Sequence, residues 1–247
     1  MYFPDLGTDT QILGGPHVRA VGWLDASVPF ATSPPGEALV DRLSLFRSAS
    51  AHAVEALSLW VAGGPHRCQF CERHHDGVNF AVPAETLLYV CPGMVGHYVG
   101  VHRYSPPKEF VEAIFDCPDP GTTDYFERCF RFNEHVANKH PALRSFLARV
   151  LANTGLASGR KLALGPGGAC SIWLRDHGTP ERETRVQITL DEHTGSLFGR
   201  VGHAPRHRSE EFVVDDEFPR LSLETVTAIV AERFKPYRHR KARPDAV

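Results

Sequence analysis

Apolar residues recur at helical spacing along much of the chain. In the first such stretch, from about residue 37 to Trp60, Leu39, Leu43 and Phe46 fall three or four positions apart, and Gly63-Gly64-Pro65 ends the pattern. The same periodicity predicts further helices over residues 94–103, 108–115, 142–153 and 222–234.

Short apolar runs bounded by turn residues predict strands. Residues 78–82 and 86–90 flank Pro83-Ala84-Glu85, an arrangement typical of a hairpin. A strand-like piece covers residues 18–24, and the second half contains four more runs, over residues 160–164, 169–174, 185–190 and 196–201. The turn from Asp191 to Gly195 favours antiparallel pairing of the last two.

Composition and charge limit the class of protein. The 247 residues carry a formal net charge of −2, with 42% hydrophobic and 23% charged residues, as in ordinary globular domains. A nearly neutral chain has no long-range attraction for a polyanion, so we expect it to bind neither nucleic acid nor a membrane surface. No run reaches the roughly 20 apolar residues that span a bilayer.

The first residues, Met1 to Leu6, include neither a basic region nor an apolar region of a secretory signal. We therefore expect a cytoplasmic location, where thiols stay reduced. The six cysteines are then metal ligands, reactive groups or core residues rather than disulfides.

Two thiols and two imidazoles have the spacing of a zinc site. Cys68 and Cys71 are separated by two residues, which lets a tight turn direct both sulfurs at one ion. His97 and His102 follow on a predicted helix, with four residues between them. That step exceeds one α-helical turn, so we expect the helix to loosen near His102. Four protein ligands would close the site and make the Zn²⁺ ion structural.

Other residues compete for places in this site. Cys91 lies just before the second helix and is the rival fourth ligand, and His66, His74 and His75 are close in sequence to the thiol turn. A redox role for Cys-x-x-Cys would need a βαβ context, which the pattern does not predict.

The order of thiol turn, hairpin and ligand-bearing helix resembles the treble-clef class of zinc modules. The predicted fold is therefore α+β, with a zinc-stabilised, treble-clef-like N-terminal module over residues 1–120. An α+β domain over residues 121–247 follows, with an antiparallel sheet of three to five strands and flanking helices. The boundary is placed in residues 117–123, which contain two prolines and a glycine.

Several motifs of the first half resemble a small uncharacterised bacterial family, a domain of unknown function. They are Tyr2-Phe3-Pro4-Asp5-Leu6, Val21-Gly22-Trp23-Leu24-Asp25, His66-x-Cys68-x-x-Cys71 and the segment from His97-Tyr98-Val99 through His102 to Pro106-Pro107 and Phe110. The resemblance covers about the first 115 residues and supports the choice of ligands. The family brings no assigned activity with it.

Two further groups are interpreted as solvated surface. His52 and Glu55, ahead of Cys68-x-x-Cys71, have residue types found in zinc deaminases, but their spacing does not fit that signature. We expect both on an exposed helix face. The acidic run Asp215-Asp216-Glu217 precedes the last predicted helix and is expected to complement its dipole.

The leading functional hypothesis is a non-enzymatic protein-binding module, with an immunity- or antitoxin-like role as one form of it. It follows from a closed metal site and the lack of a catalytic signature, and it implies a protein partner. One alternative is a hydrolase or transferase with its site in the C-terminal half, where His177, His203 and Asp176 occur without a nucleophile elbow. A second is a zinc-dependent nucleic-acid binder. No catalytic residue is assigned.

Overall fold

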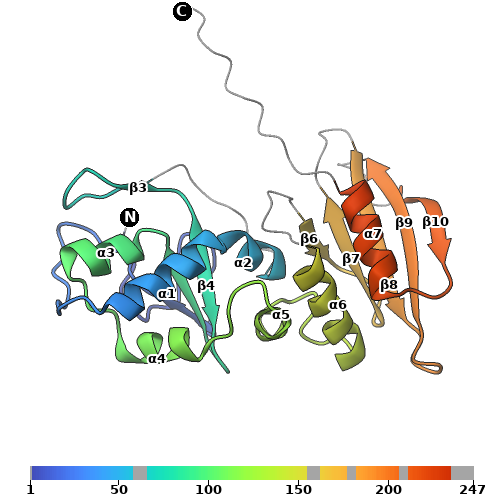
Figure 1. Cartoon of the computed structure of the whole chain (residues 1–247), viewed down its shortest axis with the longest axis horizontal. Helices are drawn as coiled ribbons and strands as arrows, with labels where there is room; N and C mark the ends of the chain where they lie inside the picture. The colour runs from blue at the N-terminus through green and yellow to red at the C-terminus, as the bar shows by residue number, and fades with distance from the viewer. Residues whose placement is uncertain (1, 58–65, 155–161, 177–181, 206–210, 235–247) are drawn as a thin grey trace, which may run out of the picture. The chain divides into compact units, whose positions relative to one another are not determined.

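The computed structural model describes residues 2–57, 66–154, 162–176, 182–205 and 211–234 (Figure 1). The chain forms two compact units, residues 1–137 and 138–247. Helix α5 (Thr123–Phe130), which follows the sequence-based boundary, belongs to the first unit. None of the described helices has the length and apolar character needed to cross a membrane.

The first unit packs helices against a three-stranded sheet of order β1-β5-β4, with a separate two-stranded ribbon, β2-β3 (Figure 1). Its remaining elements are β1 (Val18–Ala20), α1 (Glu37–Ser48), α2 (Ser50–Leu57), β2 (His66–Arg67), β3 (His75–Asp76), β4 (Asn79–Pro83), β5 (Leu88–Pro92), α3 (Val95–His102) and α4 (Lys108–Asp116). The order of thiol turn, hairpin and helix is the one that the sequence pattern predicts.

The predicted hairpin of β4 and β5 is confirmed. The strands pair antiparallel from Asn79 opposite Pro92 to Pro83 opposite Leu88, and the Ala84 amide donates to the Leu87 carbonyl across the turn. Every residue of β5 is buried, and β1 pairs with it in parallel on its other edge. Strand β5 is thus the central strand of the sheet and leads into α3.

The strand expected over residues 18–24 ends at Ala20. Gly22 has φ +76°, and a Cβ atom there would lie 2.6 Å from the Val95 side chain, so the chain turns away from the sheet where α3 comes close. Trp23 then packs its ring inward at 4% exposure, and its Nε1 donates to the Val90 carbonyl at 3.0 Å.

The helix predicted from residue 37 to Trp60 is two helices. Ala49 is the C-cap of α1, and α2 begins at Ser50, although no glycine or proline marks the break. The end of the expected helix, residues 58–60, lies outside the described residues. Phe46 of α1 contacts Phe80 of β4 and Tyr125 of α5, each at 6.1 Å between ring centroids. These rings anchor the helices to the sheet.

The described residues of the second unit form a five-stranded antiparallel sheet of order β10-β9-β8-β7-β6 and two helices, which confirms the predicted α+β class and antiparallel sheet. Its elements are α6 (Pro141–Asn153), β6 (Leu162–Gly165), β7 (Ser171–Asp176), β8 (Arg182–Leu190), β9 (Leu197–Pro205), β10 (Val213–Phe218) and α7 (Leu223–Arg233). The turn after Leu190 joins β8 to β9, as expected.

The acidic run forms the edge strand β10 and does not serve the dipole of the following helix. Asp216 pairs with Arg233 at 2.7 Å, and Asp215 lies 3.8 Å from the same guanidinium, which is in the last turn of α7. Glu217 pairs with Arg200 of β9 at 2.9 Å. The expectation that these acidic residues complement the helix dipole was wrong, because the segment pairs with the edge of β9 and contacts its basic side chains.

Candidate metal centre

Cys68 and Cys71 lie in a tight turn that is stabilised by backbone hydrogen bonds. The β2-β3 ribbon brackets the turn, pairing His66 with Asp76. Inside it, the Cys68 amide donates to the His74 carbonyl at 2.8 Å, and the Glu72 amide donates to the Cys68 carbonyl at 2.9 Å. Glu72 has φ +56°, so the chain reverses directly after Cys71.

The two histidines lie on α3, which is α-helical up to His102 and ends at Arg103. The Arg103 amide donates to the Tyr98 carbonyl, five residues back rather than four, and Arg103 itself is left-handed at φ +59°. An ideal α-helix would place residues five apart about 140° apart around its axis. The five-residue bond follows His102, so the loosening expected near His102 begins only at Arg103, and the two Nε2 atoms lie 3.2 Å apart although both residues are α-helical.

The structure brings all four predicted ligands together. Cys68 Sγ lies 3.3 Å from His102 Nε2, Cys71 Sγ lies 3.4 Å from His97 Nε2, and the two Nε2 atoms are 3.2 Å apart. All four donor atoms lie within 4.8 Å of one another. Cys68 is buried and the other three are partly exposed.

These distances fit a tetrahedral ion. With Zn–S near 2.3 Å and Zn–N near 2.0–2.1 Å, the edges of the tetrahedron would be roughly 3.6 Å for S to N and about 3.3 Å for N to N. Hydrogen bonds alone do not explain the cluster. Each Nε2 atom faces both a sulfur and the other Nε2, and one N–H group cannot satisfy two such neighbours.

The surroundings favour the deprotonated forms that a metal binds. The Arg73 backbone amide is the main cause of a lowered Cys71 pKa, and the Cys68 side chain and the His74 backbone contribute. Burial, then the charges of His74 and His102, lower the His97 pKa to about 4. Burial also lowers the His102 pKa. Both imidazoles are therefore neutral ligands near neutral pH.

Aromatic rings orient the two imidazoles. His74 stacks on His97 with 4.4 Å between centroids and 9° between planes, and Phe70 lies 5.2 Å from the His102 ring. Phe70 lies between the two cysteines in sequence. This position is the one feature of the sequence from which its contact with a ligand ring could have been predicted. Nothing in the sequence pattern indicates the stacking of His74.

The rival ligands lie outside the cluster. Cys91 is completely buried in β5, where burial raises its thiol pKa well above the usual range. His66 Nε2 is 3.2 Å from Gln11 Oε1. His74 covers the His97 ring, and His75 is exposed in β3. None of the four has a donor atom in the group that could hold an ion.

His52 is not the exposed residue that the sequence led us to expect. Its ring packs against Phe126 with 5.9 Å between centroids, and burial lowers its pKa. It does not belong to the metal cluster, which removes the remaining likeness to a deaminase.

In the second unit, His203 Nδ1 lies 3.0 Å from an oxygen of Asp215, across the β9-β10 pair. Asp176 is buried at the end of β7, and His177 lies outside the described residues. The described residues therefore pair His203 with Asp215 and assign no nucleophile to it.

Comparison with known families places the first half of the chain. Residues 1–115 match the model of a domain of unknown function, DUF7919. This match confirms the resemblance to an uncharacterised family, and its span contains all four clustered residues. No curated protein and no solved structure matches the chain.

Proposed function

We propose that this protein is a non-enzymatic binding module whose first unit is held together by one structural Zn²⁺ ion. The observation that supports this most directly is the convergence of Cys68, Cys71, His97 and His102 to within 4.8 Å. Two thiolates and two neutral imidazoles are a typical donor set for structural zinc. The ion would join the turn after β2 to helix α3.

A closed site argues for stability rather than catalysis. Catalytic zinc keeps one position for water or substrate, whereas four protein ligands complete the tetrahedron. The ligand pairs are 26 and 34 residues apart in the chain, so the unfolded chain has no preformed site. The binding free energy of the ion would then add to the folding free energy of the first unit.

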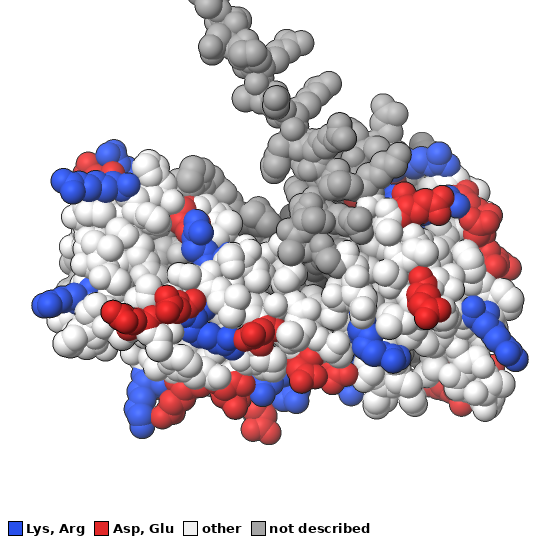
Figure 2. All heavy atoms as spheres, viewed as in Figure 1, with Lys and Arg blue, Asp and Glu red and all other residues white. Residues whose placement is uncertain are grey.

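The alternatives have less support. A hydrolase or transferase in the second unit would need a nucleophile beside His203. Among the described residues, the contact of this ring is with Asp215 at Nδ1, with no serine or cysteine beside it. A nucleic-acid binder would need a contiguous basic face. On the face shown in Figure 2, the described acidic and basic side chains are interspersed, in keeping with the formal net charge of −2.

A module of this kind acts by binding, and we include a protein partner in the proposal, with an immunity- or antitoxin-like role as one form of it. A pull-down from the native host, with and without nuclease treatment, distinguishes the classes of partner. Nuclease-resistant recovery of one protein in stoichiometric amount supports the proposal, and recovery of nucleic acid alone contradicts it.

The metal is tested on the full chain, purified under reducing conditions without chelator. Elemental analysis is expected to find one zinc per chain, and Co²⁺ substitution should give the visible absorption of a tetrahedral thiolate site. Cys71→Ala and His97→Ala should abolish both signals, since each removes one ligand of a partly exposed site.

Matched controls use residues of the same types outside the cluster. Cys170→Ala and His75→Ala should retain full metal content, because neither residue belongs to the group that could hold an ion. Metal-free wild-type protein, or unchanged metal in the ligand variants, would refute the zinc site.

A further inference from the structure

The cysteines of the first unit differ in their access to solvent. Cys71 is partly exposed. The buried cysteines of residues 1–137, each at most 2% exposed, are Cys68, Cys91, Cys117 and Cys129. Cys170, the other partly exposed cysteine of the chain, belongs to residues 138–247. A dissolved oxidant therefore meets a predicted metal ligand before it meets any other thiol of the first unit.

A second sulfur lies within reach of this accessible thiol. The Sγ atoms of Cys68 and Cys71 belong to the donor group whose members all lie within 4.8 Å of one another. The turn between them is compact, because the Glu72 amide donates to the Cys68 carbonyl at 2.9 Å. A disulfide joins cysteines whose Cα atoms are roughly 4.4–6.8 Å apart, which is the span of one tight turn. Formation of an S–S bond therefore needs a rearrangement of this turn alone.

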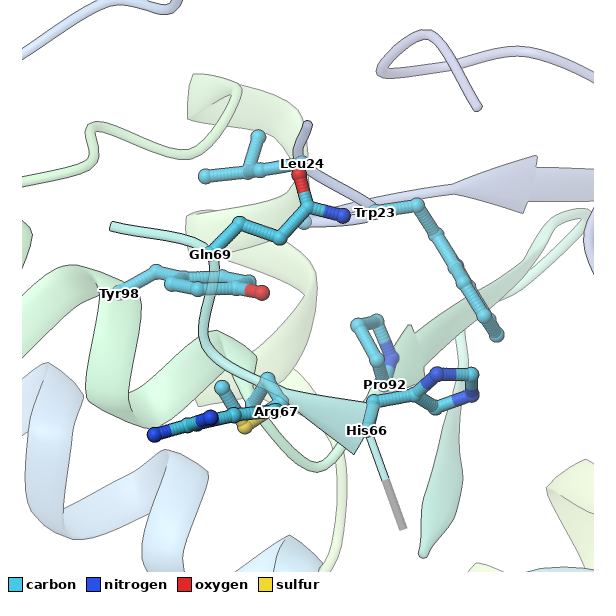
Figure 3. Close-up of a pocket in the computed structure, with 9 residues that line it drawn as sticks. Trp23, Leu24, His66, Arg67, Gln69, Pro92 and Tyr98 are labelled. Carbon is cyan, nitrogen blue, oxygen red and sulfur yellow. The ribbon is translucent and has the colours of Figure 1, made fainter. Parts of the chain in front are cut away.

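The turn is loosely packed on one side. A cavity of about 50 Å³ lies between residues 66–69 of the turn and the segments 22–24 and 92–98. Figure 3 shows Gln69 beside Tyr98 of α3, with Trp23 across the cavity from them. Phe70 also contacts Tyr98, with 5.6 Å between ring centroids. Since ligand bonds to one ion are much stronger than such ring contacts, zinc would supply most of the attachment of the turn to α3.

We propose that the metal site is an oxidant-sensitive switch, in which a peroxide joins Cys71 to Cys68 as a disulfide and the protein releases the ion. This switch rests on the proposed function, because it concerns the regulation of the same site. It differs from a catalytic Cys-x-x-Cys pair, since the thiolates give up their own bonds to the metal and act on no further substrate. The zinc-loaded state fixes the turn to α3, and the oxidised state releases it.

The reaction balances with one molecule of peroxide. The Cys71 thiolate attacks a peroxide oxygen, so that an S–O bond forms, the O–O bond breaks and hydroxide leaves. The Cys68 thiolate then attacks the Cys71 sulfur, an S–S bond forms, the S–O bond breaks and a second hydroxide leaves. Two protons from solvent convert the hydroxides to water, and the two electrons that the sulfurs lose reduce the peroxide. His97 and His102 alone do not complete a tetrahedral site.

The test adds hydrogen peroxide to the full zinc-loaded chain. A chromogenic chelator follows zinc release, with the same chelator without peroxide as the reference, and mass spectrometry with peptide mapping follows the thiols. We expect complete loss of zinc, a mass loss of two hydrogen atoms and a disulfide between Cys68 and Cys71. Dithiothreitol with added Zn²⁺ should restore the metal content. Zinc loss that dithiothreitol does not reverse would overturn the switch.

The order of attack is tested with dimedone, which traps sulfenic acids. The adduct is expected on Cys71, because Cys68 is 0% exposed, and an adduct on Cys68 alone would contradict the order of steps. Cys170→Ser is the matched control variant, since it removes the other partly exposed thiol and no residue of the donor group. Its zinc release should be unchanged in rate and extent, and a loss of release would show that oxidation proceeds through Cys170 and overturn the switch.

Zinc content is measured before peroxide is added, so that the two proposals fail separately. Protein that contains no zinc contradicts the metal site itself. Protein that keeps its zinc while peroxide oxidises Cys170 overturns the switch and leaves the zinc site standing. Hydrogen exchange is a readout that does not depend on metal analysis. Oxidised protein should exchange faster than zinc-loaded protein in residues 66–76, and unchanged exchange there would contradict the release of the turn from α3.

Discussion

The backbone amide of Arg103 donates to the carbonyl of Tyr98, five residues earlier, at the end of α3. This bond comes directly after His102, whose Nε2 lies 3.3 Å from Cys68 Sγ, while His97 Nε2 lies 3.4 Å from Cys71 Sγ. The Tyr104 amide donates to the same carbonyl at 3.0 Å, which directs the chain away from the helix. The helix therefore ends immediately after its second ligand.

Two glycines near this helix should respond oppositely to alanine. A Cβ atom on Gly93 would lie 2.6–2.8 Å from the Asp76 carboxylate, which is buried and fixed by Arg47 and by the Val78 amide. Gly93→Ala should lower the free energy of unfolding by about 2 kcal/mol or more. Gly100→Ala, whose Cβ would be 3.8 Å from Val40, should raise it by about 0.5–1 kcal/mol.

Urea denaturation at fixed zinc content measures both variants. Gly100→Ala is the control for the helix itself, because it lies between the two histidine ligands. Equal effects of the two substitutions on the free energy of unfolding would show that the Asp76 side chain can move away from residue 93. That result would contradict its fixation by Arg47 and the Val78 amide.

The metal ligands could be predicted from sequence because the chemistry of zinc restricts both residue type and spacing. Cys68-x-x-Cys71 requires a turn, and His97 and His102 follow on one predicted helix. The loosening expected near His102 does not precede that residue, because α3 is α-helical to its end. The stacking of His74 on His97 could not be predicted, since no periodicity specifies which ring lies on which.

The fold was predictable where burial leaves a pattern. Strands β4, β5 and β8 bury much of their length and show apolar runs or alternation. Strand β10 was missed because all of its residues from Val213 to Glu217 are exposed. An edge strand without a buried face shows no alternation of apolar and polar residues in the sequence. The break at Ala49 was missed because the apolar spacing continues across it.

Chelation should loosen the first unit and spare the second. All four clustered residues lie in residues 1–137, so removal of zinc is expected to raise amide exchange in residues 66–76 and 95–104. Strands β8 and β9 of the second unit should exchange at an unchanged rate. Hydrogen exchange by mass spectrometry resolves both regions, and Cys71→Ala without chelator should reproduce the pattern. Uniform exchange across both units would contradict a local role for the ion.

Alkaline pH should destabilise the first unit through a buried thiol. Burial raises the Cys117 pKa from 9.0 to about 12, although the positive charges of Arg128 and Arg42 act to lower it. Above pH 9 the unfolded state loses this proton while the folded state keeps it, so stability is full below pH 9 and falls as pH rises towards about 12.

The decline attributable to Cys117 is at most about 1.4 kcal/mol per pH unit. Urea denaturation between about pH 8 and about pH 11 measures it, and Cys117→Ala should flatten the curve by this contribution. An identical curve for the variant would mean that Cys117 ionises as easily in the folded protein as in the unfolded chain.

Burial, not distance, should decide the strength of two ion pairs in the second sheet. Glu183 with Arg185 and Glu217 with Arg200 both have oxygen and nitrogen 2.9 Å apart. The Glu183 side chain is 4% exposed and also lies 3.6 Å from Arg175, whereas the Glu217 side chain is 62% exposed. Glu183→Gln removes the negative charge 2.9 Å from the buried Arg185 guanidinium and should cost about 3 kcal/mol or more.

Glu217→Gln should change stability by no more than about 0.5 kcal/mol, since water and salt screen an exposed pair. Fluorescence of Trp173, the one tryptophan in residues 138–247, reports unfolding of this unit in both variants. Added salt should reduce the small effect at Glu217 and leave most of the effect at Glu183, because a buried pair is screened much less. Equal losses would indicate that solvent reaches Glu183 and Arg185 as freely as it reaches the edge strand.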